Sequence, residues 1–512
     1  MNLPRPSRWS SPALRGVRLL ALAAACALWS AAEAAGADDA EQRLSGVHAR
    51  MAAEAQAEAG PGSAASEANW SDLQAPAVAL REGSAGMGLT SLKTRVYGYL
   101  PYFSPIVTSG AALRWDLITD LIVFDADLKP DGTVSSWHGW PQAGLVSKAH
   151  ANGVKIHLAA ALFNSASPGG EIAAFLASPA ARAQAIHTLV NSIQQNGADG
   201  VSYDFEFVPS TSRDAFSMFV EETRKALDAA VPGAELTLAT PPNTGYRGYD
   251  FARLSASADR ILLMAYDYHW AAAPNTGPVA PLTKGAFWGA STSGDMTGVL
   301  AVAPAAKLAM GVPYYGNDWA AESDQRSAKT TAKGKSVLLK AAIPNAATYG
   351  RLWDADAQNP WYRYQSSGVW HQAWYEDRDS LTAKYQWAKG KALGGVMVWA
   401  LGYDSGVSDA EGALLGVFGG GAVTDGGSDA GADAGTSDAG TNDAGTNDAG
   451  TNDAGADAGT SDAGASDAGL PDASSDGGQT TTAAVSGGCS GPGATGFTAL
   501  ALLAFALRRR RA

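Results

Sequence analysis

The stretch Asp199-Gly-Val-Ser-Tyr-Asp-Phe-Glu-Phe207 decides what fold to expect from this chain. Val, Tyr and Phe are frequent in it and turn residues flank it on both sides, so the pattern predicts a β-strand. Side chains alternate along a strand, which places Ser202, Asp204 and Glu206 on one face. Two carboxylates on one face of a strand indicate either a solvated polar surface or a reaction centre.

Seven other apolar segments of strand length accompany this one between residues 91 and 419. The eight candidate strands are 95–103, 117–126, 154–163, 200–207, 235–241, 260–268, 307–315 and 394–401. Helical patterns separate several of them, at 180–195, 212–230 and 380–391. This alternation predicts parallel strands with helical crossovers, and eight such units have the size of an α/β (β/α)8 TIM barrel. A doubly wound sheet is the alternative, disfavoured because no glycine-rich turn follows the first strand.

Active sites of TIM barrels lie at the carboxyl ends of the strands, where this sequence gathers acids and aromatic residues. These strand ends carry Tyr97, Tyr99, Asp125, Asp127, Asp204, Glu206, Tyr266, Asp267, Trp270, Tyr314, Trp319, Trp399 and Asp404. Contact with water explains acids at such ends but does not favour tryptophan. The pattern therefore favours the reaction centre over the solvated surface.

The segment 320–379, between the seventh and eighth strands, is long and rich in aromatic residues. Long loops in compact domains tend to be functional, so we expect a small insertion that forms one wall of a cleft. The alternative is that its aromatic residues form a core of their own.

The amino-terminal residues have the pattern of a targeting segment followed by a lead-in. Residues 1–34 combine four arginines, an apolar run at 19–29 and a small-x-small site at 32–34, which predicts a signal peptide. Residues 35–90 have few aromatics, so we expect a mostly flexible lead-in in which 43–59 could form one helix.

The acidity of the chain is concentrated in residues 420–483. Between Asp425 and Asp476 there are 12 Asp and no Lys or Arg, out of a net charge of −13, so the barrel segment is close to neutral and shows no face for nucleic acid. The repeated Asp-Ala-Gly units predict a disordered, extended linker; calcium binding by the repeats is a less favoured alternative. The two cysteines, Cys26 and Cys489, lie in terminal segments, which excludes a Cys-rich zinc site.

Residues 484–512 combine Gly488-Cys489, an apolar run at 494–507 and four arginines at 508–511. This layout resembles the MYXO-CTERM type of bacterial sorting tail. The resemblance implies processing and lipid attachment at Cys489, with the barrel displayed at the cell surface or secreted.

Tryptophans and paired carboxylates on a barrel rim point to carbohydrate chemistry. Residues 95–404 resemble glycoside hydrolase family 18, the chitinase-like enzymes. The matching motifs are the strand 199–206 (family pattern DGxDxDxE), Met264–Trp270 (MxYDxxW), Lys307–Gly316 and Gly394–Trp399. The stretch Trp374–Asp377 is similar to the branch that contains spore-cortex lytic enzymes.

The resemblance implies a retaining, substrate-assisted mechanism without metal or cofactor. Glu206 would be the general acid and base, Asp204 would stabilise the oxazolinium ion, and Tyr266 would hydrogen-bond the N-acetyl carbonyl. Substrate would bind to Trp399, Asp267, Tyr97, Tyr99, Trp270, Tyr314 and Ser202.

Two departures from the family pattern bear on activity. Ser202 stands where the family has a middle aspartate, and residues 159–164 stand where many members have SxGG. The resemblance implies an exported monomeric glycosidase that cleaves β-1,4 bonds in N-acetylglucosamine-containing polysaccharide, with membrane contact only through its tail. Its substrate would be chitin or peptidoglycan, with N-glycan cores as a further alternative. The alternatives are a non-catalytic or weakly catalytic carbohydrate-binding barrel and an inert structural surface protein.

Overall fold

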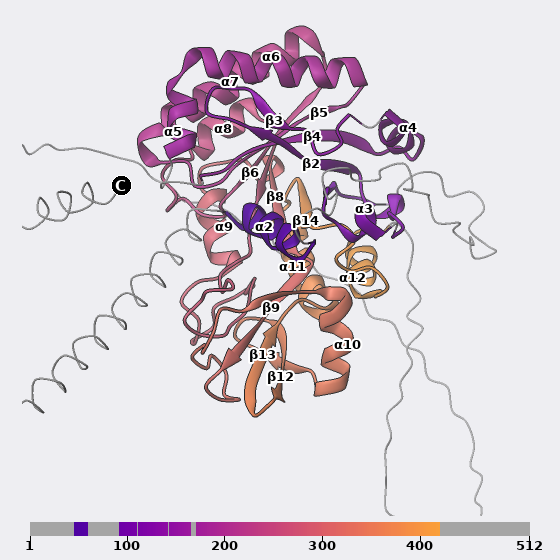
Figure 1. Ribbon diagram of the computed structural model, residues 1–512, viewed down its shortest axis with the longest axis vertical. Coiled ribbons are helices and arrows are strands. Elements are labelled where there is room, and N and C mark those ends of the chain that lie inside the picture. Colours follow the sequence, from indigo (N-terminus) through magenta and orange to yellow (C-terminus); the bar gives the residue numbers. More distant parts are fainter. Residues whose placement is uncertain (1–45, 60–91, 110, 142, 165–169, 420–512) are drawn as a thin grey trace, which may run out of the picture. The chain divides into compact units, whose positions relative to one another are not determined.

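A computed structural model describes residues 46–59, 92–109, 111–141, 143–164 and 170–419 (Figure 1). The predicted signal peptide, the acidic linker and the sorting tail with Cys489 lie outside these residues and stay predictions. No helix within the described ranges combines the length and apolar character needed to cross a membrane.

Eight parallel strands form a closed barrel, because β1 pairs with both β14 and β2. The strands, in spatial order, are β1 (Val96–Pro101), β2 (Asp120–Leu128), β4 (Lys155–Leu162), β5 (Gly200–Phe205), β6 (Glu235–Thr240), β7 (Arg260–Leu263), β8 (Leu308–Pro313) and β14 (Gly395–Trp399). A short strand, β3 (Val134–Ser136), pairs with β2 in antiparallel orientation. The predicted TIM barrel and all eight predicted strands are confirmed.

Helices surround the barrel and cover the outward-facing apolar side chains of its strands. They are α3 (Pro105–Ser109), α4 (Ala143–Ala151), α5 (Gly170–Ala177), α6 (Pro179–Asn196), α7 (Arg213–Ala230), α8 (Phe251–Ser257), α9 (Thr292–Leu300), α11 (Arg378–Gly390) and α12 (Asp409–Phe418), with 3-10 turns at Trp115–Leu117, Ser210–Ser212 and Ala305–Lys307. The helix before β5, α6, has a residue suited to capping at each end. The Ser178 side chain accepts a hydrogen bond from the Ala181 N–H at its start, and Gly197 ends it in the left-handed conformation, with φ 69°. The turn after Gly197 leads directly into β5.

The insertion after β8 forms a second, five-stranded sheet. Its strands are β9 (Tyr315–Ala321), β10 (Lys335–Leu338), β11 (Leu352–Asp354), β12 (Asn359–Ser366) and β13 (Val369–Trp374), with α10 (Leu339–Tyr349) beside them. The rings of Trp361 and Trp374 stack with centroids 5.0 Å apart, and both are buried. These tryptophans thus belong to the core of the insertion, as the alternative interpretation held.

One helix of the expected lead-in packs on the barrel. This helix, α2 (Val47–Ala59), lies by the carboxyl ends of the strands, and Val47, His48 and Met51 are buried there (Figure 1). Its alanine-rich sequence favours a helix, within the range 43–59 proposed above. The expectation of a mostly flexible lead-in did not anticipate that this part packs against the barrel.

Candidate active site

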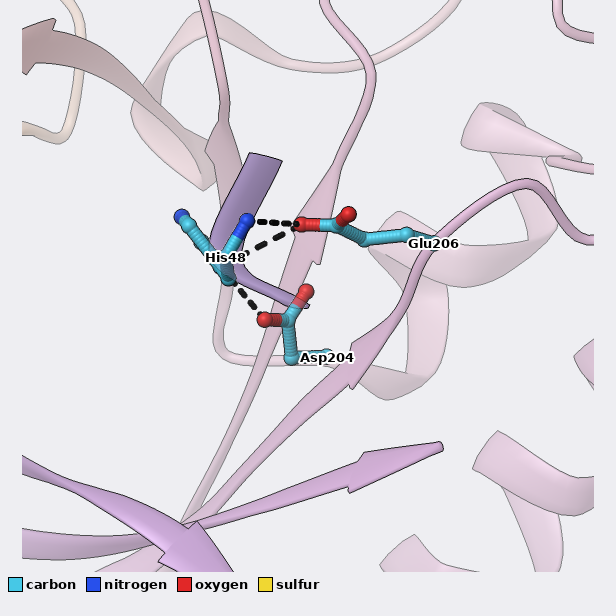
Figure 2. A group of neighbouring side chains, drawn as sticks. All are labelled: His48, Asp204 and Glu206. Atoms are coloured by element: carbon cyan, nitrogen blue, oxygen red, sulfur yellow. Dashed lines mark hydrogen bonds and ion pairs between the residues drawn. The ribbon is translucent and has the colours of Figure 1, made fainter. Parts of the chain in front are cut away.

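Asp204 and Glu206 lie at the carboxyl end of β5, as the alternation of side chains predicts. Both are buried, with exposed fractions of 0% and 2%. Their outer oxygens, Asp204 Oδ1 and Glu206 Oε2, have no hydrogen-bond partner among the described residues. Figure 2 shows the two carboxylates side by side and directed toward His48 of α2. They form an acidic pair in a poorly solvated position, not a solvated polar surface.

Burial changes the protonation of both carboxyls. It raises the pKa of Asp204 well above its usual range. Burial, with the charge of Asp204 as the second cause, raises the pKa of Glu206 to about 8. A carboxyl with such a pKa holds its proton near neutral pH and can donate it to a leaving group.

Aromatic side chains surround this acidic pair. Trp399, the last residue of β14, and Tyr99 of β1 lie with ring centroids 5.5 Å apart. The hydroxyl of Tyr99 shares a hydrogen bond of 3.1 Å with Ser202 Oγ. Tyr266, just beyond β7, is buried beside them, and its hydroxyl contacts Met397 Sδ at 3.9 Å. The structure therefore brings Tyr99, Ser202, Tyr266 and Trp399 to the carboxylates, as expected.

A cavity of about 530 Å³ adjoins Glu206. Its lining includes Val47, Arg50, Glu206, Tyr246, Tyr266, Asp267 and Trp270. Tyr315 donates a hydrogen bond of 2.5 Å to Asp267 Oδ1, which fixes that carboxylate at the cavity wall. Asp267 and Trp270 thus lie where the sequence placed them.

Tyr97 and Tyr314 do not join this group. The hydroxyl of Tyr97 accepts a hydrogen bond of 2.9 Å from Arg260 Nε, and its ring lies under Arg95 at the amino ends of the strands. Tyr97 has the same strand parity as Tyr99 but occupies a different layer of the barrel. The Tyr314 hydroxyl lies 3.2 Å from that of Tyr385 on α11. Neither Tyr97 nor Tyr314 therefore lies beside the acidic pair, and the prediction that they line the substrate site is corrected.

The sequence interpretation missed the residues of α2 that fill the site. His48 Nδ1 lies 2.5 Å from Asp204 Oδ2, and its Nε2 lies 2.9 Å from the Tyr266 hydroxyl. The His48 backbone N–H donates to Glu206 Oε1 at 3.3 Å, and its ring stacks on Trp399 at 3.5 Å. The helical pattern of 43–59 was the available signal, but nothing in it specified the surface to which the helix binds.

Three groups of His, Asp and Glu in the described residues bring possible metal ligands within 4.8 Å of one another. They are His48–Asp204–Glu206, Asp120–His157–Glu235 and Asp125–Asp127–His138. In the first, both His48 nitrogens already contact Asp204 and Tyr266. In the second, Arg95 forms ion pairs with Asp120 and Glu235. Hydrogen bonds and ion pairs already engage both of these groups.

The sequence pattern described as "Glycosyl hydrolases family 18" matches residues 95–404, more than half of the chain. The matched range begins just before β1 and ends after β14, so it comprises the barrel and the insertion.

Individual relatives match over the same part. The chain is 30% identical over 232 residues to the protein described as the sporulation-specific glycosylase YdhD of Bacillus subtilis (strain 168), covering 44% of this chain and 52% of the relative. It is 25% identical over 225 residues to the cortical fragment-lytic enzyme of the same organism, covering 42% and 49%. The chain thus spans about half the length of these relatives.

A solved chitinase from Chromobacterium violaceum ATCC 12472 shares the fold. The two superpose with a TM-score of 0.51 at 24% identity, covering 63% of this chain and 99% of the chitinase.

Proposed function

We propose that this chain, which belongs to glycoside hydrolase family 18, hydrolyses β-1,4 bonds in N-acetylglucosamine-containing glycans. One observation carries the proposal: two buried carboxyls, Asp204 and Glu206, adjoin Tyr266 and Trp399 at the carboxyl end of a TIM barrel. The names of the relatives, a sporulation-specific glycosylase and a cortical fragment-lytic enzyme, favour activity on glycans.

Glu206 begins the reaction as a general acid. Its carboxyl donates a proton to the glycosidic oxygen while the bond from C1 to that oxygen breaks. The carbonyl oxygen of the substrate's own N-acetyl group attacks C1 and forms an oxazolinium ion. Water then attacks C1 while the bond from C1 to the acetamido oxygen breaks and the N-acetyl group is restored. Glu206 accepts a proton from that water, and the configuration at C1 is retained.

Asp204, Tyr266 and Trp399 serve the N-acetylated sugar in this mechanism. The Asp204 side chain accepts a hydrogen bond from the acetamido N–H as positive charge develops on that nitrogen. The Tyr266 hydroxyl donates to the acetamido oxygen and fixes its direction of attack. The indole of Trp399 stacks under the sugar ring. Asp267, Trp270 and Tyr99 extend the binding surface.

Ser202 favours a second candidate function, a carbohydrate-binding barrel with little or no catalysis. Its hydroxyl bonds Tyr99 and cannot hold the negative charge of an aspartate. Asp204 consequently has no carboxyl at position 202 with which to share a proton. A slow enzyme and a binding protein would both retain the aromatic surface, so turnover distinguishes them.

We also propose that the chain is exported to the cell surface. This proposal rests on the signal-like residues 1–34 and on the Gly-Cys, apolar and arginine pattern of residues 484–512. Chitin and peptidoglycan both lie outside the cytoplasm, where an exported enzyme meets them.

The test is hydrolysis of N-acetylglucosamine oligomers and of peptidoglycan by the purified protein and by Glu206→Gln, each cut between residues 60 and 91 so that α2 can leave the site. We expect turnover only with Glu206, with binding retained in Glu206→Gln. Equal turnover by both proteins excludes the assigned acid, and binding without turnover by either protein supports the binding barrel.

A further inference from the structure

The helix α2 occupies the space in which the proposed mechanism places a sugar. We propose that α2 is an intramolecular inhibitor, and that a glycan enters the site only after α2 has left it. The inference rests on the proposed function and adds its regulation.

His48 makes the contacts that the mechanism assigns to the N-acetylated sugar. Its ring stacks on Trp399 with centroids 3.5 Å apart and planes 18° apart. One ring nitrogen contacts Asp204 (Figure 2). The other contacts the Tyr266 hydroxyl. The two contacts correspond to those of an acetamido N–H and carbonyl. Burial lowers the pKa of His48 to about 4, so the ring is neutral and presents one donor and one acceptor.

The amino-terminal end of α2 points at the catalytic acid. The first N–H groups of a helix have no partner within it and carry partial positive charge. One of them, the N–H of His48, donates to Glu206 Oε1 at 3.3 Å. Gly46 lies so close to Glu206 that a Cβ at that position would fall within 3 Å of three of its atoms. The start of α2 therefore contacts the carboxyl of the proposed acid, Glu206.

Neighbouring residues of α2 contact further parts of the binding surface, beside the remaining cavity. Arg50 forms an ion pair with Asp267 and lies over the ring of Trp270 at 5.2 Å. Met51 Sδ accepts a hydrogen bond of 3.0 Å from Trp399 Nε1. Glu54 accepts a hydrogen bond of 3.0 Å from Ser336 on the insertion. One helix thus contacts the proposed acid, Trp399 and the insertion together. Contacts at three places indicate a specific docking position for α2.

Covalent attachment makes this inhibition strong. Residues 60–91 join α2 to the barrel, so the helix remains at a high effective concentration that a free glycan must exceed. Cutting the chain in this stretch removes that advantage and lets α2 diffuse away.

The experiment uses the full chain with a sequence-specific protease site inserted between residues 60 and 91. Calorimetry measures binding of the N-acetylglucosamine tetramer before and after cutting, in a Glu206→Gln background that keeps an acceptor for the His48 N–H. Because the open state is rare in the intact chain, cutting should raise the apparent affinity by about 10-fold or more.

The double variant His48→Ala with Arg50→Ala should show a similar rise in affinity for the tetramer without cutting. The control variant Ala53→Gln, at an exposed position of α2, should not.

A synthetic peptide of residues 46–59, added to the cut and purified chain, should compete with the tetramer. If the tetramer binds equally well before and after cutting and the peptide does not compete, α2 is no inhibitor although the glycan site stands. If the peptide binds but no glycan does after cutting, the proposed function fails, and the inhibition with it.

Discussion

Both ends of the barrel hold buried carboxyls, but the pKa of Asp120 at the amino end is lowered while the pKa of Glu206 at the carboxyl end is raised. At the amino end, Asp120 and Glu235 form ion pairs with Arg95, and His157 lies 3.0 Å from Asp120. At the carboxyl end, Asp204 and Glu206 lie side by side, and one oxygen of each has no hydrogen-bond partner among the described residues.

The pKa values follow from these surroundings. Burial alone would raise the pKa of Asp120, but its hydrogen bonds and charge interactions with His157 and Arg95 lower it to about 2. Burial and the neighbouring Asp204 raise the pKa of Glu206 to about 8. Paired charges stabilise the amino end of the barrel. At the carboxyl end, the two neighbouring carboxyls contact His48 but have no Lys or Arg bonded to them in the described residues. Buried carboxyls with raised pKa values are candidates for catalysis.

The largest effect concerns the proposed acid. Glu206→Gln, in the chain freed of α2, should lower kcat/KM on N-acetylglucosamine oligomers by about 100-fold or more, because Gln cannot donate the proton. Initial-rate kinetics measure it, with the tetramer affinity as control for an intact site. A loss below tenfold would mean that another group supplies the proton.

At the amino end, the expected effect is on stability. Arg95→Met should lower the free energy of unfolding by about 2–4 kcal/mol, because Asp120 would remain buried without its cation. Urea denaturation at neutral pH measures this change, and Glu206→Gln should show no such loss. A stable Arg95→Met protein would show that His157 alone suffices for Asp120.

The two ends should respond to pH in opposite directions. The Glu206 pKa is raised, so its contribution to stability is present below about 4.5, its ordinary value, and is lost as pH rises through about 8. The Asp120 pKa is lowered, so its contribution is present above about 3.8 and is lost as pH falls through about 2.

Thermal unfolding of the wild type and of Glu206→Gln between pH 4 and 9 tests the first of these signs. The Gln variant should gain relative to the wild type as pH rises. A constant difference would show that Glu206 is not destabilised by ionisation.

The smallest effect concerns Ser202. An added carboxylate in Ser202→Asp should raise the pKa values of Asp204 and Glu206 further, because like charges disfavour ionisation. Activity of the chain freed of α2 should then persist to higher pH, with kcat changed by less than about tenfold. An unchanged pH profile would mean that residue 202 does not couple to the acid.

Much of this architecture follows from the sequence. Alternation along 199–207 placed Asp204 and Glu206 on one face, and the strand and helix periods predicted the barrel. The alternation of side chains along a strand also places Tyr97 on the same face as Tyr99. It does not show how far along the barrel axis Tyr97 lies, because that depends on how the strands align and bring Tyr97 to Arg260. The docking of α2 was not predictable, because helix propensity depends on local residues while docking depends on the surface formed by β1, β5, β7 and β14.

The product of the first turnover tests the account most directly. The chain cut between α2 and the barrel is given N-acetylglucosamine tetramer, and NMR records the configuration at the new reducing end before it equilibrates. With Glu206 as the acid of a retaining mechanism, we expect the β anomer from the wild type and no product from Glu206→Gln on that time scale. An initial α anomer, or equal product from both proteins, would contradict it.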